Sequence, residues 1–331
     1  KKHKRGVENV ILFQSRSLSN TKKYYIYFDV IRSVYRWEDI VCIGVKYNVF
    51  RFISLNFLIR RLIRKNSTKR ICLHSHHYLM SFFLTRWTDI FTVHDALYYQ
   101  YKKKKRKYLF IFRFIEMMVY RKTKLVHFIS EYAKSQALSK YLTKTEIIPN
   151  TCNFRLSNVN ISLENTTPLH DEYKKILIVR SIEERARIDL VLEVVENMQN
   201  EPILFDIVGK GPLLDHYKEM AKRRKLYNVV FHDYVSNDEL VKFYLQTDIV
   251  MVPAEYGEGF GLPIIEGYFF NKPVIASNIC AIPDVIIDKK YLFENRVADV
   301  RDKIAYALMK NNSINFREYY LNTFSFELIS A

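Results

Sequence analysis

The feature that most constrains this chain is a repeated alternation of short apolar runs with helical stretches of about ten residues. In the second half, Lys175–Val179, Ile203–Val208 and Ile249–Val252 are short and mostly apolar runs, and helical segments follow them. Continuous runs of this kind are typical of parallel strands that are buried on both faces. Strands that alternate with helices predict βαβ units and parallel sheets.

The first half shows the same alternation less regularly, and its length suggests a domain of its own. A chain of 331 residues is too long for one core of ordinary size. The stretch Asn153–Thr167, rich in Asn, Ser and Thr, has no periodicity and predicts a linker. We therefore expect an α/β fold of two Rossmann-like domains, residues 1–155 and 156–331, with parallel sheets facing a central cleft. The strands expected in the first domain are Asn9–Phe13, Tyr24–Phe28, Asp39–Val45, Arg70–His74, Ile90–Val93 and Leu125–Ile129.

The cysteines and the apolar runs bear on the compartment. The four cysteines are far apart, form no Cys-x-x-Cys pair and lie in or beside apolar runs: Cys42, Cys72, Cys152 and Cys280. This pattern predicts buried, reduced packing residues in a reducing cytosol. No run reaches 18 uninterrupted apolar residues, so we expect no transmembrane helix.

The net charge of +17 is unevenly distributed. Through Asn150 there are 31 basic and 9 acidic residues, a net charge of +22, whereas the remainder has 21 basic and 26 acidic residues, a net charge of −5. Such an asymmetry indicates that the first half faces a polyanionic surface, either a membrane or a nucleic acid.

A cationic run next to an aromatic helix favours the membrane. Six consecutive cations, Lys102–Lys107, precede the apolar and aromatic segment Tyr108–Tyr120, and a second basic helix is expected over Phe50–Lys65. Both suit an anionic bilayer surface, so we expect a cytoplasmic protein that is peripheral at the inner face of the cell membrane. A solvated loop beside a core helix is an alternative, as is nucleic-acid binding, although no known nucleic-acid module is present.

The run Pro253–Glu266 carries the strongest chemical signal. A strand ends in a turn with three glycines, Gly257, Gly259 and Gly261, and a helix then begins near Pro263. Glycines allow a ligand close to the backbone, and a helix N-terminus adds partial positive charge, so the turn suits phosphate. Glu258 and Glu266 bracket this turn. Because carboxylates bind phosphate poorly, we expect them to hold sugar hydroxyls. Gly-rich turns between a strand and a helix also occur in many other α/β proteins.

These residues resemble a known signature. EGFGLPIIEG, preceded by DIVMVPAEYG and followed by NKPVIASN, resembles the E-x7-E motif of retaining family 4 glycosyltransferases of the GT-B fold, the glycosyl transferases group 1. ILFDIVGKGPLLDHY and VVFHDYVSNDELVKFYLQTDI are similar to the family's preceding strand–helix units. The resemblance is strong over Ile176–Ile282, moderate over Leu125–Asn150 and fades before Ser75.

The resemblance implies a retaining hexosyltransferase. Its donor would be a UDP-sugar or a GDP-sugar, with no further cofactor, and its acceptor a glycan or a lipid-linked intermediate of bacterial surface polysaccharide (lipopolysaccharide) synthesis. Glu258 would contact the donor sugar and Glu266 the ribose hydroxyls. The other donor-binding positions implied are Phe260, Gly261, Leu262, Gly209 and Tyr234.

Two arginines are expected to bind the diphosphate. The family has a Gly-Arg pair after one strand and a Lys five or six residues later. Val179, Arg180 and Arg185 occupy these places in one register. The other register aligns Arg180 with the glycine, retains Arg185 and puts Ala186 at the lysine. We prefer the first, because a diphosphate needs two cations. Solvated surface arginines are the simpler alternative.

Histidines end two strands of the first domain. The family often has a histidine that contacts the donor sugar where His94 stands, so His94 is a candidate for facing the reacting carbon. His74, His76 and His77 form a second cluster, which we interpret as a cleft wall or an acceptor contact rather than a metal site, because no fourth ligand is evident.

No Asp-x-Asp triplet occurs in the sequence. Enzymes that hold a nucleotide sugar through a divalent metal generally need such paired carboxylates, so we expect a metal-independent enzyme. An epimerase or a phosphorylase of the same fold, and a non-catalytic basic protein that binds membranes or nucleic acid, are the alternatives.

Overall fold

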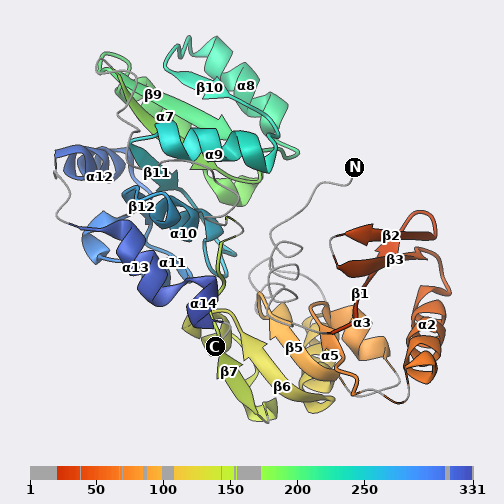
Figure 1. Ribbon diagram of the computed structural model, residues 1–331. Helices are drawn as coiled ribbons and strands as arrows, with labels where there is room; N and C mark the ends of the chain where they lie inside the picture. Colours follow the sequence, from red (N-terminus) through yellow and green to blue (C-terminus); the bar gives the residue numbers. More distant parts are fainter. Residues whose placement is uncertain are drawn as a thin grey trace. The chain divides into compact units, whose positions relative to one another are not determined.

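The structure is a computed structural model that describes residues 21–37, 39–66, 68, 70–84, 88–98, 108–142, 144–152, 154, 173–309 and 314–329. The chain forms two compact units, unit 1 ending at Ile148 and unit 2 beginning at Pro149 (Figure 1). Three segments discussed above lie outside the described residues: Asn9–Phe13, Lys102–Lys107 and almost all of Asn153–Thr167.

The first residues of unit 2 pack against its last helices. Thr151 Oγ1 lies 3.0 Å from the Tyr320 hydroxyl, and Cys152 Sγ lies 3.2 Å from the same oxygen. These contacts tie Thr151 and Cys152 to unit 2, which begins somewhat earlier than the boundary expected after residue 155.

Unit 1 contains two small sheets. In the first, β1 (Lys23–Asp29) pairs in parallel with β3 (Ile40–Lys46), and β2 (Ser33–Trp37) pairs antiparallel with β3. The helix α2 (Arg51–Lys65) follows and buries Leu55 against apolar side chains that include those of β1.

The second sheet is parallel, in the order β4-β5-β6-β7. Ser130 caps the helix Glu131–Ser135, because its Oγ accepts a 3.0 Å hydrogen bond from the Ala133 N–H. The strands are β4 (His74–Ser75), β5 (Thr88–Val93), β6 (Thr123–Phe128) and β7 (Thr145–Ile147). The helices described around them are α3 (Tyr78–Phe83), α5 (Leu109–Arg121), α6 (Glu131–Ser135) and the 3-10 helix η1 (Ser139–Tyr141).

Two expectations for unit 1 are corrected. The strand expected over Arg70–His74 is shorter and lies later, at His74–Ser75, the two residues that pair with β5. Cys72 therefore lies outside the sheet and is exposed, whereas Cys42 and Cys152 are buried as expected and Cys280 is partly exposed. The antiparallel strand β2 was not expected at all.

Unit 2 is built on one six-stranded parallel sheet in the order β10-β9-β8-β11-β12-β13. Its strands are β8 (Lys174–Val179), β9 (Ile203–Val208), β10 (Val229–Phe231), β11 (Ile249–Val252), β12 (Val274–Ser277) and β13 (Leu292–Phe293). Its α-helices are α7 (Ile188–Asn197), α8 (Leu214–Arg223), α9 (Asn237–Gln246), α10 (Leu262–Phe269), α11 (Ile282–Val285), α12 (Val297–Met309), α13 (Phe316–Thr323) and α14 (Phe326–Ile329), and its 3-10 helices are η4 (Glu184–Ala186) and η5 (Lys289–Tyr291).

The central strands of this sheet are covered on both faces. All four residues of β11 are fully buried, and so are Ile176 and Ile178 of β8. This double burial explains why the strands read as continuous apolar runs rather than as alternating ones. Each such side chain contributes about 1.5–3 kcal/mol relative to an exposed one, so unit 2 gives its surface loops a rigid base.

A reciprocal cap fixes the start of α9. Ser236 Oγ accepts a hydrogen bond from the Glu239 N–H, and the Glu239 carboxylate accepts one from the Ser236 N–H. Two backbone donors that the helix itself leaves unpaired are thereby satisfied, which fixes the start of α9 at Asn237. None of the helices in the described part of the chain combines the length and the apolar character needed to cross a bilayer.

Candidate functional site

The order of strands in unit 2 locates a site. Numbered along the chain, the strands lie in the order 3-2-1-4-5-6, so the direction of winding reverses between β8 and β11. In open parallel sheets, ligands bind beyond the carboxyl ends of the strands at such a reversal. The loops that leave β8 and β11 at this point are residues 180–187 and 253–261, and they contain the expected arginines and the glycine-rich turn.

A buried ion pair joins these two loops. Arg180 Nη1 lies 2.5 Å from Glu258 Oε2, and the two side chains are 6% and 13% exposed. Arg180 Nε is also buried and has no hydrogen-bond partner in the described residues. A buried donor without a partner is costly, so this guanidinium has capacity for a further acceptor.

The charge state of Glu258 follows from this pairing. Burial alone would raise its pKa, but the Arg180 guanidinium, the nearby Arg185 and a hydrogen bond from the Gly261 N–H together hold the pKa below its usual value. Arg185 donates from Nη1 to the Gly257 carbonyl at 2.8 Å. Both arginines named from the sequence therefore reach the glycine-rich turn.

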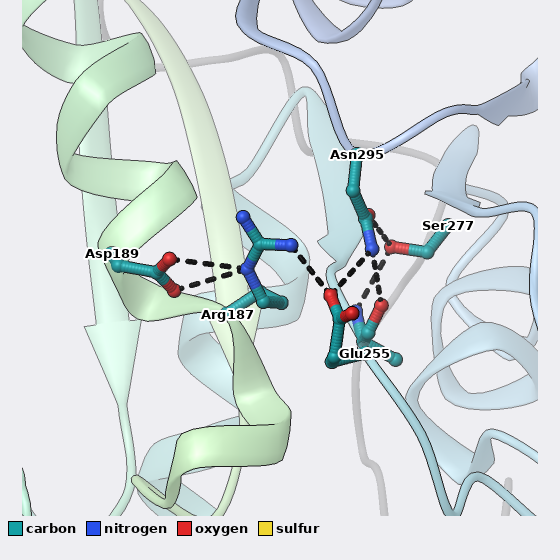
Figure 2. Close-up of polar contacts among 6 residues, drawn as sticks. Arg187, Asp189, Glu255, Ser277 and Asn295 are labelled. Carbon is teal, nitrogen blue, oxygen red and sulfur yellow. Dashed lines mark hydrogen bonds and ion pairs between the residues drawn. The ribbon is translucent and has the colours of Figure 1, made fainter.

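A second network supports the same loops from the side (Figure 2). Arg187 donates from Nε to both oxygens of Asp189, at 3.2 and 3.1 Å, and from Nη1 to Glu255 at 2.5 Å. Asn295 Nδ2 donates to the Ala254 carbonyl at 2.8 Å, and its Oδ1 accepts from Ser277 Oγ at the same distance. These residues stand at or after the ends of β8, β11, β12 and β13, so one network ties four strand ends together.

The start of α10 is shaped by glycine. Gly261 has φ +91°, a left-handed conformation that strains residues with side chains, and a Cβ there would lie 2.8 Å from Ile264 Cδ1. The helix begins at Leu262, with Pro263 in its first turn. Phe260 is buried with its ring against Phe324, at 5.9 Å between centroids. Phe260 therefore presents backbone rather than side chain at this turn.

Glu266 lies one helical turn into α10 and is held by α9. The buried Tyr244 hydroxyl donates to Glu266 Oε2 at 2.6 Å. Burial raises the pKa of Glu266, although this hydrogen bond opposes the shift. Sequence reasoning missed Tyr244, because nothing in an amphipathic helix distinguishes this tyrosine from an ordinary core residue.

The two upstream candidates have different surroundings. Gly209 donates its N–H to the Asp233 carbonyl at 2.7 Å, and a Cβ on it would lie only 1.7 Å from the Arg180 carbonyl. Close packing against the β8 loop thus accounts for this glycine. Tyr234 is exposed, and Lys210 Nζ lies 5.4 Å from its ring centroid. A donor contact at either residue stays a prediction.

Unit 1 has its own polar cluster, at the carboxyl ends of β4, β5 and β6. His94 Nε2 lies 3.1 Å from His76 Nδ1, and the rings are stacked. His76 in turn stacks on His74, whose Nε2 lies 2.7 Å from Thr92 Oγ1. Burial lowers the pKa of His94 to about 4 and that of His74 to about 3, so both rings are neutral at pH 7.

His127 determines which atoms donate and which accept in the hydrogen bonds of this cluster. Its Nε2 lies 2.9 Å from the Ile148 carbonyl, which only accepts, so a neutral His127 is protonated at Nε2 and accepts at Nδ1. Thr92 Oγ1, 2.9 Å from that Nδ1, then donates to it and accepts from His74. Sequence reasoning missed His127 inside an apolar strand, and it grouped His77 with the cluster. His77 instead caps α3, accepting from the Met80 N–H.

The described residues contain no group of three His, Cys, Asp or Glu side chains that could hold a metal ion. Within unit 2 the structure brings together Arg180, Arg185, Glu258 and the start of α10. His94 belongs to the histidine cluster of unit 1.

Comparison with solved structures identifies the fold. Sucrose-phosphate synthase from Thermosynechococcus elongatus superposes with a TM-score of 0.79 at 15% identity, over 98% of this chain and 90% of that one. Anabaena HepE, solved in complex with UDP and glucose, gives a TM-score of 0.70 at 13% identity, over 88% of this chain and 83% of that one. The fold is therefore that of the GT-B glycosyltransferases, an α/β fold with parallel sheets, as expected.

Sequence comparisons point to one family of glycosyltransferases. Residues 162–320, slightly under half of the chain, match the family model of glycosyl transferases group 1. An uncharacterized 41.2 kDa protein in the cps region of Klebsiella pneumoniae is 24% identical over 84% of this chain and 80% of its own length. The O-antigen chain mannosyltransferase C of Escherichia coli is 29% identical over 44% of this chain and 39% of its own length. Together these similarities support a glycosyltransferase of group 1.

Proposed function

We propose that this protein transfers a sugar from a nucleoside-diphosphate sugar, with retention of configuration at the anomeric carbon, to a glycan or a lipid-linked acceptor. The observation that carries the proposal is the buried Arg180 beside Glu258 at the strand-order reversal of unit 2. Its Nε has no partner among the described residues, so the guanidinium is suited to an anionic ligand.

The arginines would act on the leaving group. Transfer breaks the bond between the anomeric carbon and the β-phosphate oxygen, and negative charge grows on the nucleoside diphosphate as it leaves. Arg180, Arg185 and the N-terminus of α10 place positive charge at this turn. Each charge-assisted hydrogen bond contributes about 1.5–3 kcal/mol, and fixed donors aimed at developing charge lower the barrier. No metal is needed in this scheme.

The ion pair must rearrange when the donor binds. Without donor, Glu258 neutralises Arg180 at 2.5 Å. A diphosphate that approaches Arg180 replaces this partner, and the Glu258 carboxylate becomes available to accept hydrogen bonds from the hydroxyls of the donor sugar. This exchange couples phosphate binding to the placement of the acid beside the sugar.

Glu266 would hold the ribose. Tyr244 occupies its Oε2, so Oε1 is the oxygen proposed to accept from ribose hydroxyls. The relatives in a cps region and in O-antigen synthesis support an acceptor from bacterial surface polysaccharide synthesis. We further propose that the reaction takes place in the cytoplasm at the inner membrane face, with unit 1 toward the anionic lipids.

The test is donor binding followed by product analysis. UDP or GDP should raise the melting temperature of the full chain, because a ligand that binds only the folded state stabilises it. Turnover of the matching sugar nucleotide should continue in EDTA, and NMR of the product should show the anomeric configuration of the donor. A metal requirement would contradict the electrostatic role of the arginines, and an inverted product would contradict retention.

The same experiment separates the rival functions. An epimerase would release an isomerised sugar nucleotide, and a phosphorylase would require inorganic phosphate. Salt-dependent binding of duplex DNA without any stabilisation by nucleotide would favour a non-catalytic basic protein.

A further inference from the structure

The helix α2 has two apolar sides, and the core of unit 1 uses one of them. Leu55 and Ile59 are buried in a cluster with Leu84. Ile53 and Phe57, which lie one turn apart on the other side, are 69% and 70% exposed. A surface helix of a globular domain normally places polar residues there. Packing within the described chain thus leaves this outer apolar side unexplained.

The exposed side begins before the helix. Val49 and Phe50 precede Arg51, the first residue of α2, and are 87% and 65% exposed. Their spacing to Ile53 and Phe57, three or four residues at each step, continues the same helical side. The apolar part of this surface therefore consists of Val49, Phe50, Ile53 and Phe57, which we name the α2 ridge.

Cations continue the ridge toward the end of the helix. Arg61 and Arg64 lie one and two turns beyond Phe57, and both are exposed. Arg64 and Lys65 occupy the last turn, and the sequence of α2 contains no acidic residue. The outer side of this helix therefore changes from apolar to cationic along its length, and α2 itself supplies no carboxylate to neutralise it.

Two neighbouring helices of unit 1 carry further exposed aromatic side chains. Phe52 of α2 stacks on Phe83 of α3, with ring centroids 4.1 Å apart, and Asn56 Nδ2 donates to the Phe83 carbonyl. The adjacent Phe82 contacts Phe114 of α5 at 6.0 Å. Phe83 and Phe114 are themselves partly exposed, and so is Phe110 on α5. Figure 1 shows α3 between α2 and α5, in agreement with these contacts.

We propose that the α2 ridge inserts into the headgroup and acyl boundary of an anionic membrane, with Arg61 and Arg64 on the lipid phosphates. A helix with large apolar residues on one side and arginines beside them lies in the plane of such an interface. A second copy of the chain is a poorer occupant, because the residues through Asn150 carry a net charge of +22 and two such surfaces repel each other. The inference deepens the membrane partner in the proposed function and identifies the residues that enter the lipid.

Sedimentation with vesicles tests the ridge. The full chain should sediment with phosphatidylglycerol vesicles and much less with phosphatidylcholine vesicles, and high salt should release only part of it. The double variant Ile53→Ser, Phe57→Ser should weaken sedimentation by at least about tenfold. The double variant Arg61→Gln, Arg64→Gln should weaken it mainly at low salt. Met309→Ser is the control, because Met309 is an equally exposed apolar residue of unit 2.

Nucleotide binding separates this inference from the proposed function. The ridge variants should retain whatever thermal stabilisation by UDP or GDP the parent shows, because the α2 ridge belongs to unit 1 and the proposed nucleotide site belongs to unit 2. If the parent sediments and is not stabilised by nucleotide, the ridge survives and the donor site is wrong. If the Ile53→Ser, Phe57→Ser variant sediments as well as the parent, the ridge is wrong whatever the nucleotide result.

A fluorescence probe tests insertion directly, in case the serine variants are misfolded. Phe57→Trp adds one tryptophan at the ridge, and brominated lipid should quench the added emission when vesicles bind. Met309→Trp should show no such quenching. Bound Phe57→Trp protein without quenching would overturn the proposal. Concentration-dependent dimerisation that Ile53→Ser, Phe57→Ser abolishes would make the ridge a contact between copies and would equally overturn it.

Discussion

Unit 1 and unit 2 are both α/β, yet they arrange polar groups at strand ends in opposite ways. In unit 2 the strand ends carry charge, with Arg180 and Glu258 paired and Arg187 joined to two carboxylates. In unit 1 the strand ends carry neutral histidines, partly or fully buried, that bond to one another, to Thr92 and to a backbone carbonyl. Charged loops suit a site where an arginine exchanges one ionic partner for another when an anionic ligand binds. A chain of neutral, hydrogen-bonded rings suits a surface that keeps one shape.

The largest effect should come from Arg180→Ala. This change removes the cation that would stabilise the departing nucleoside diphosphate, and it leaves Glu258 buried without its ionic partner. Loss of one fixed donor to developing charge costs about 10²–10³ in kcat, so turnover should fall by at least that factor. Steady-state kinetics of donor consumption measure it. Arg301→Ala, which breaks an exposed ion pair of the same unit with Glu201, is the matched control and should change turnover little.

The two glutamates should separate binding from turnover. Glu266→Ala should weaken binding of UDP or GDP by about 1–3 kcal/mol, because it removes the proposed ribose contact. Glu258→Ala should lower turnover without weakening the affinity for free nucleotide, because its proposed contact in the complex is the donor sugar and its removal leaves Arg180 free for the diphosphate. Calorimetric titration together with kinetics distinguishes the two. Equal losses of nucleotide affinity in both variants would remove the proposed division of roles.

A smaller effect should distinguish the units by pH. His74 and His94 have folded pKa values of about 3 and 4, below their ordinary 6.5, so between these values the unfolded chain binds more protons. Their contribution is present above pH 6.5 and is lost as the pH falls toward 4. Each histidine should cost unit 1 about 1 kcal/mol between pH 7 and 5.5.

Tryptophan fluorescence reports this loss for unit 1 alone, since both tryptophans of the chain, Trp37 and Trp87, belong to it. The urea midpoint should fall between pH 7 and 5.5, and His74→Gln should reduce the fall. A midpoint that does not change with pH would show that the histidines titrate alike in both states.

The sequence predicts unit 2 well because its signals are local. The turn Gly257–Gly261 and the helix after it lie on one contiguous stretch, and the helix α9 has its cap next to it in sequence. Both arginines predicted to bind the diphosphate contact this turn in the structure, and their binding of a diphosphate stays a prediction. The pairing of Arg180 with Glu258 was not foreseen, because 78 positions separate them and the sheet order alone brings them together.

Unit 1 was harder to predict because its features depend on contacts between segments that are far apart in the sequence. Its histidine cluster is assembled across three strands, and His127 is hidden among apolar residues of β6. The short strand β2 exists because it pairs with β3, since its own five residues carry no distinctive pattern. Cys72 was expected to be buried because an apolar run surrounds it, but strand pairing begins only at His74. Tertiary pairing decided each of these outcomes.

The Arg187 network also determines how the strand-end loops of unit 2 open. Arg187 itself has φ +50°, a backbone conformation that is unfavourable for a residue with a side chain, and its contacts to Asp189 and Glu255 hold it there. The Glu255 N–H also donates to the Arg185 carbonyl, so neither loop can lift away without breaking bonds to the other. The strand-end loops of unit 2 should consequently open as a single cooperative unit, with amides on both sides showing the same free energy of opening in hydrogen exchange.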